Sequence, residues 1–143
     1  MTMVRIVGVG ILLSGSVVAM QTRPAGSKEA ERVSIIQLIA TPERYEGRRI
    51  LVKGFCHLEF EEQALYLSRE DSDTMNSSNG LWLVIEGKDD DVSDRFVVVE
   101  GVFTAKEHGH LGAWPGEIQN ISILERAGTR ADYQALRPPP PKK

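Results

Sequence analysis

The segment RRILVKGFCHLEF (residues 48–60) predicts one long β-strand that runs from Arg49 to Phe60. Side chains alternate between the two faces of a strand. The inner face is therefore expected to carry Ile50, Val52, Cys56, Leu58 and Phe60. Gly54 falls on that same face, where the missing side chain allows the strand to bend sharply.

A second segment, FVVVEGVFTA (residues 96–105), repeats the order of Val, a charged residue and Gly. The two matching elements are Val52-Lys53-Gly54 and Val99-Glu100-Gly101. Two long β-branched strands, each bent at a glycine, predict a small closed barrel. In such a barrel the first and fourth strands pair antiparallel, which would make Lys53 and Glu100 cross-strand neighbours.

The rest of the domain supplies three more strands and a helix. Strands are expected at 64–68, 81–86 and 117–125, and residues 69–80 are expected to form a mobile loop because they are polar. Ser34 is a suitable N-cap for a helix over 35–39, and Gly47 suits a left-handed stop. The predicted fold is mainly β, a five-stranded OB-like Greek-key barrel with an N-terminal capping helix.

The chain divides into four expected segments. Residues 1–19 are expected to be a signal peptide, because one positive charge precedes a short apolar run that ends at Ala19. Residues 20–32 follow as a linker, 33–126 as the barrel domain and 127–143 as a disordered Pro-rich tail. The protein is thus expected to be extracytoplasmic, either periplasmic or secreted, with no transmembrane segment in the mature chain. An uncleaved N-terminal membrane anchor is the alternative.

The charge of the expected domain restricts its partners. Between Val33 and Arg126 there are nine Lys or Arg and 17 Asp or Glu, a formal charge of −8. Nucleic-acid affinity depends on Lys and Arg contacts with phosphates, so single-strand nucleic-acid binding is disfavoured. A protein or a small neutral or cationic molecule is the expected ligand.

Cysteine and histidine offer little chemistry. Cys56 is the one cysteine, so no intrachain disulfide is possible, and its inward position predicts a buried apolar role. His57, His108 and His110 define the alternative function, a metal-binding protein or a hydrolase. No nucleophile motif or metal-ligand spacing is present. An enzyme is therefore not expected, and no catalytic residue, metal ligand or cofactor is assigned.

Aromatic side chains on the opposite face of the strands define the candidate binding site. Tyr66 and Trp82 alternate away from the inward leucines, and OB-folds bind ligands on the face of strands two and three. The predicted ligand-binding residues are Tyr66, Trp82, His108, His110 and Trp114. The alternative is that these aromatics pack beneath the 69–80 loop or the N-terminal helix, and this reading is preferred for Phe55.

A family resemblance accompanies this interpretation. It rests on Leu38-Ile39, Pro42, Tyr45, Gly47, Gly54-Phe55, Leu58-Glu59-Phe60-Glu61, Ala64-Leu65-Tyr66-Leu67, Glu70-Asp71, Leu81-Trp82, Val99-Glu100-Gly101, Gly109-His110-Leu111-Gly112 and Asn120-Ile121. With these residues the chain resembles, over about 35–125, a family of small uncharacterised bacterial exported proteins. The resemblance implies an OB-like barrel and carries over no activity and no catalytic residue.

Overall fold

The computed structural model describes residues 29–87 and 89–130. The predicted signal peptide (1–19) lies outside the described residues, as do most of the predicted linker and most of the predicted tail. Within the described part, no helix is long and apolar enough to cross a membrane.

The described residues form six strands and several short helices. The strands are β1 (Glu31–Val33), β2 (Arg49–Glu59), β3 (Glu62–Tyr66), β4 (Gly80–Leu83), β5 (Arg95–Thr104) and β6 (Glu117–Arg126). The helices are α1 (Ile35–Ala40), α2 (Pro42–Tyr45) and α3 (Arg69–Asp73), with 3-10 turns η1 (Ser77–Asn79) and η2 (His110–Gly112). The prediction of a mainly β protein is confirmed.

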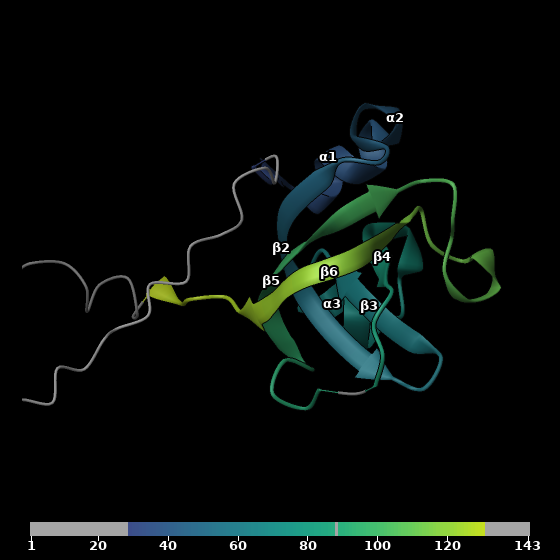
Figure 1. Cartoon of the computed structure of the whole chain (residues 1–143). Coiled ribbons are helices and arrows are strands. Elements are labelled where there is room, and N and C mark those ends of the chain that lie inside the picture. The colour runs from purple at the N-terminus through teal and green to yellow at the C-terminus, as the bar shows by residue number, and fades with distance from the viewer. Residues whose placement is uncertain (1–28, 88, 131–143) are drawn as a thin grey trace, which may run out of the picture.

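The strands form one sheet that closes in a ring, in the order β1-β2-β3-β4-β6-β5, with β2 also paired to β5 (Figure 1). The sequence predicted five strands, which is wrong by one. The additional strand, β1, pairs parallel with β2 and begins at Glu31, inside the predicted 20–32 linker. A strand of three residues has too little alternation to be recognised from the sequence.

Antiparallel pairing of the first and fourth predicted strands is confirmed by the β2–β5 ladder. The register differs from the expectation, because Lys53 lies opposite Val98 and Glu100 lies opposite Leu51. Glu100 Oε1 instead forms an ion pair of 3.5 Å with Arg49 Nη1. The two Val-charged-Gly elements therefore meet at their valines, Val52 and Val99, and their charged residues are not opposite each other.

Helix α1 begins as the sequence predicts. The Ser34 hydroxyl accepts a hydrogen bond of 3.2 Å from the Gln37 amide, and the Gln37 side chain accepts one of 2.9 Å from the Ser34 amide. This capping box satisfies two amides at the start of the helix. Ile35 and Leu38 then point into the core, and Gly47 has the predicted left-handed conformation with φ of 68°.

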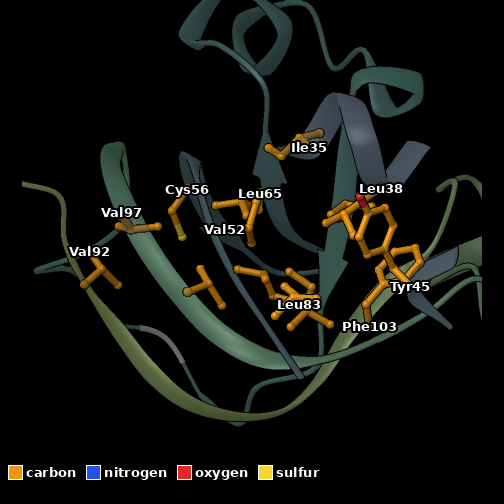
Figure 2. Close-up of a cluster of buried hydrophobic side chains, with 14 of the residues drawn as sticks. Ile35, Leu38, Tyr45, Val52, Cys56, Leu65, Leu83, Val92, Val97 and Phe103 are labelled. Carbon is orange, nitrogen blue, oxygen red and sulfur yellow. The ribbon is translucent and has the colours of Figure 1, made fainter. Parts of the chain in front are cut away.

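The interior of the ring is a mostly aliphatic core that also holds Tyr45 and Phe103 (Figure 2). Ile50, Val52, Cys56 and Leu58 of β2 are buried there as predicted. Burial raises the pKa of the Cys56 thiol to about 12, so this cysteine is an apolar packing residue at neutral pH. Phe60 is not on the inner face, because β2 ends at Glu59. Leu67 is also exposed, since β3 ends at Tyr66.

The segment 69–80 was predicted to be a mobile loop, but it contains α3 and η1. Its centre is the carboxylate of Asp71, which accepts hydrogen bonds of 2.8 Å from the Ser68 hydroxyl and of 2.9 Å from each of the Asn76 and Asn79 amides. Hydrogen bonds from Asn79 and Ser68 lower the pKa of Asp71. The polar residues Ser68, Asn76 and Asn79 thus order this segment by donating hydrogen bonds to the Asp71 carboxylate.

Asp71 should make the stability of the domain dependent on acid pH. Because its folded-state pKa is lowered, its stabilisation is fully present above the unfolded value of about 3.9 and is lost as the pH falls through the folded pKa. Asp71→Ala should therefore reduce the free energy of unfolding more at pH 7 than at pH 3, as measured by urea denaturation. Asp73→Ala, an exposed change in the same helix, is the control. An Asp71→Ala effect of equal size at both pH values would contradict this role.

Gly54→Val should destabilise the domain. A Cβ atom at this position would lie 2.7 Å from Ile35 Cδ1, from Leu65 Cγ and from the Tyr66 carbonyl oxygen. Overpacking of this kind costs about 1–3 kcal/mol in the free energy of unfolding, which chemical denaturation measures. Lys53→Val, on the exposed side of the same strand, should change stability by less than about 0.5 kcal/mol. Equal stabilities of the two variants would rule out the close approach at Gly54.

Candidate functional site

A second, smaller apolar cluster lies on the outer face of the ring. It contains the buried residues Phe55, Ala64, Tyr66 and Trp114, with the half-buried Trp82 packed against them. The prediction that Phe55, Tyr66 and Trp82 face away from the inner core is confirmed. This outer aromatic cluster covers parts of β2, β3 and β4.

The outer aromatic cluster is held together by ring contacts. The Trp114 ring lies edge-on to Tyr66, with centroids 5.3 Å apart, and is tilted against Trp82 at 6.0 Å. Tyr66 is only 1% exposed and Trp114 only 7% exposed. These two residues support the site from below, and neither offers a free surface for stacking.

The loop between β5 and β6 folds over this face. His108 donates from Nδ1 to the Trp114 carbonyl at 2.8 Å, and the Trp114 amide donates back to the His108 carbonyl at 3.2 Å. The backbone of Gly109 lies directly against the Trp82 ring, and its φ is 60°. The His110 ring stacks on Trp82 with centroids 6.3 Å apart and an interplanar angle of 26°.

The five predicted site residues are therefore neighbours, but the loop fills most of the space between them. Tyr66 is buried and cannot contact a ligand directly, whereas Trp82 is half-buried. Phe55 is likewise covered, because the Arg69 guanidinium of α3 lies 4.7 Å above the centre of its ring. For Phe55 the packed interpretation is confirmed.

Two exposed apolar residues beside this cluster were missed by the sequence reasoning. Phe60, at the tip of the β2–β3 turn, is 92% exposed, and Leu111, in the β5–β6 loop, is 89% exposed. The two loops meet where Glu61 Oε2 lies 3.7 Å from His110 Nε2. Glu61 and Leu111 both have left-handed backbones, with φ of 62° and 55°. Phe60 directly precedes Glu61, and Leu111 is itself in a turn. Their place in these turns was the sequence signal that could have indicated their exposure.

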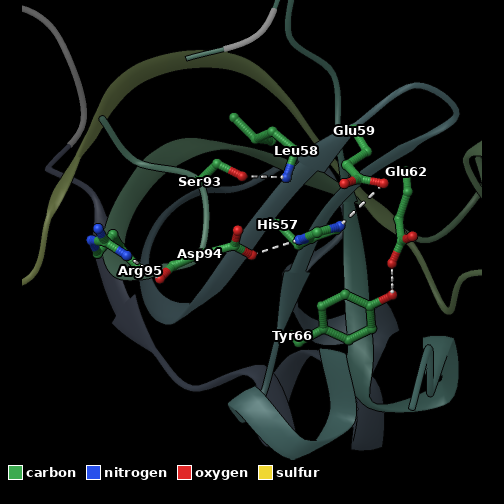
Figure 3. A network of polar contacts seen from close by, with 8 residues as sticks. All are labelled: His57, Leu58, Glu59, Glu62, Tyr66, Ser93, Asp94 and Arg95. Carbon is green, nitrogen blue, oxygen red and sulfur yellow. Dashed lines mark hydrogen bonds and ion pairs between the residues drawn. The ribbon is translucent and has the colours of Figure 1, made fainter. Parts of the chain in front are cut away.

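Carboxylates lie beside Tyr66, Trp82 and His110. Trp82 lies between Ala64 and Glu117 on neighbouring strands. The Tyr66 hydroxyl donates a hydrogen bond of 2.5 Å to Glu62, and burial together with this contact raises the pKa of Tyr66 (Figure 3). Because the Tyr66 hydroxyl stays neutral, the charge at this side of the site comes from the glutamates. The negative charge of these glutamates favours the binding of cationic groups.

The histidines of the alternative function have separate partners. His57 Nδ1 lies 2.7 Å from Asp94 Oδ1, and its Nε2 lies 3.8 Å from Glu59 Oε2 (Figure 3). His108 contacts the Trp114 carbonyl, whereas His110 contacts Trp82 and Glu61. Among residues 29–87 and 89–130, no three His, Cys, Asp or Glu side chains are placed to hold a metal ion together.

No protein-family model, curated protein or solved structure matches this chain. The resemblance to a family of small exported bacterial proteins therefore stays a prediction.

Gly109→Ala should lift the loop from Trp82. The new Cβ atom would lie 2.5 Å from Trp82 Cγ, so either the loop or the indole must move. Tryptophan fluorescence should shift to longer wavelength as water reaches Trp82.

Gly112→Ala is the matched control for this experiment. Its φ of 69° imposes a similar backbone strain, but a Cβ atom there meets nothing within 4 Å. Identical emission spectra of the two variants would show that the loop does not depend on contact with Trp82.

Proposed function

We propose that this protein is an exported OB-like binding module and that the outer face of β3 and β4, with the two adjoining loops, is its contact surface. The pairing of β2 with β5 and the parallel pairing of β4 with β6 support an OB-like closure of the ring. In an OB-fold, the ligand site is the face of strands two and three, flanked by the first and last interstrand loops. Those elements correspond here to β3, β4, the β2–β3 turn and the β5–β6 loop.

The observation that carries the proposal is the exposure of Phe60 and Leu111 at the tips of these two loops. The contact between Glu61 and His110 brings the two loops together, and exposed apolar residues gathered on one surface mark protein contact sites. Trp82 and His110 stack on each other beside these loops and are partly accessible. Tyr66 and Trp114 act beneath them as a rigid base.

The chemistry of this surface indicates a protein partner that presents apolar side chains together with Lys or Arg. Glu59, Glu61 and Glu62 come from the β2–β3 turn and its flanks, and Glu117 lies beside Trp82. The formal charge of −8 between Val33 and Arg126 also favours a basic partner. Export is part of this proposal and rests on residues 1–19 alone.

Peptide selection can test the surface directly. A random peptide library selected on the wild-type domain should yield sequences rich in apolar and basic residues. The double variant Phe60→Ser and Leu111→Ser should bind these peptides at least about tenfold more weakly, because each removes an exposed anchor. The same variant should keep its melting temperature, since neither side chain is buried.

Met75→Ser, another exposed apolar residue outside this surface, is the matched control and should bind normally. Selected peptides that are acidic would refute the proposed surface. So would peptides that bind the double variant as tightly as they bind the wild type.

A further inference from the structure

A separate groove carries the opposite charge to the rest of the domain. It has a volume of about 450 Å³ and is lined by Arg69, Asp94, Arg95, Phe96, Arg126 and the segment Ala127–Thr129. We propose that this groove binds a small organic anion in which a phosphate or carboxylate is attached to a planar aromatic ring. This site is independent of the acidic surface proposed above.

The arginines of the groove keep their charge available. Arg95 donates from Nη1 to the Asp94 carbonyl at 2.9 Å, and Arg126 donates from Nε to the Asp91 carbonyl at 2.8 Å. A carbonyl is neutral, so these bonds orient the guanidinium groups without compensating their charge. Within the described residues, none of Arg69, Arg95 and Arg126 forms an ion pair with a carboxylate. Guanidinium groups bind phosphate and carboxylate through paired N–H donors.

Asp94 is the one carboxylate among the lining residues, and it is already engaged. Its Oδ1 lies 2.7 Å from His57 Nδ1. In Figure 3 the Asp94 carboxylate points toward His57, while the Arg95 side chain extends in the opposite direction. The carboxylate that would repel an anion is therefore directed to a histidine.

Phe96 supplies an apolar surface next to the guanidinium groups. It is 45% exposed although it belongs to β5. The ring is held in place by an edge contact with Phe55, with centroids 5.4 Å apart, and Lys53 Nζ lies 5.8 Å from its centre. A fixed, exposed aromatic ring can stack on a planar ligand. The volume of the groove is also within the usual range for small-molecule sites, roughly 300–1,000 Å³.

Titration of the full chain with four probes tests the ligand chemistry. Phenyl phosphate and benzoate carry both features, inorganic phosphate carries only the charge, and benzyl alcohol carries only the ring. At least one aryl anion should bind saturably, by calorimetry or by NMR shifts of the residues around Phe96. The two single-feature probes should bind roughly tenfold more weakly or not at all. Tighter binding of phenyl phosphate identifies a phosphate ligand, and tighter binding of benzoate identifies a carboxylate ligand.

Substitutions then test the location. Arg126→Gln, Arg95→Gln and Phe96→Leu should each weaken aryl-anion binding by roughly tenfold while the circular dichroism spectrum stays that of the wild type. Arg44→Gln removes the same charge from α2, outside the groove, and should leave binding unchanged.

Three results would overturn the inference. The first is that neither aryl anion binds saturably. The second is that all folded groove variants bind like the wild type. The third is that Arg44→Gln weakens binding as much as Arg126→Gln does, which would indicate a nonspecific effect of surface charge.

Discussion

At Gly54, strand β2 passes so close to Ile35, Leu65 and the Tyr66 carbonyl that no side chain fits between them. This close approach brings β2 near β3 and α1, and β2 pairs with other strands along both of its edges. The first half of β2 pairs with β1 on one edge and with β5 on the other. Its second half pairs with β3 in place of β1, and β5 continues on the opposite edge as far as Cys56. The closure of the ring, which encloses the core, depends on this pairing of β2 along both of its edges.

Alternation along β2 also divides its apolar residues between two environments. Val52, Cys56 and Leu58 fill the interior, whereas Phe55 joins the aromatic cluster outside. The outer aromatic cluster is covered by the β5–β6 loop and by α3, so it stabilises these segments much as a core stabilises strands. A loop anchored on Trp82, and on Tyr66 through its own Trp114, can hold an exposed tip such as Leu111 in a fixed position, which reduces the entropy lost on binding.

Charge is distributed unevenly over this small molecule. Glutamates surround the aromatic face of β3 and β4, while arginines from α3, β5 and β6 converge on the groove beside Phe96. The formal charge of −8 is the sum over the whole domain and describes neither region. Two surfaces of opposite sign allow one domain to bind two ligands of different chemistry, since electrostatic complementarity acts locally at protein surfaces.

The sequence by itself determined the long bent strand, its repeat at Gly101, the capped helix after Ser34 and the buried role of Cys56, because alternation and capping are local properties. It also selected five residues that prove to be neighbours. It did not reveal β1, the ordered 69–80 segment or the exposure of Phe60, since each depends on partners distant in the chain. Only the tertiary structure decided that Tyr66 and Trp114 are buried supports, that Phe60 and Leu111 are the exposed tips, and that three arginines share a groove. Strand periodicity states which face a side chain occupies, but whether another segment covers that face is decided by packing between distant parts of the chain.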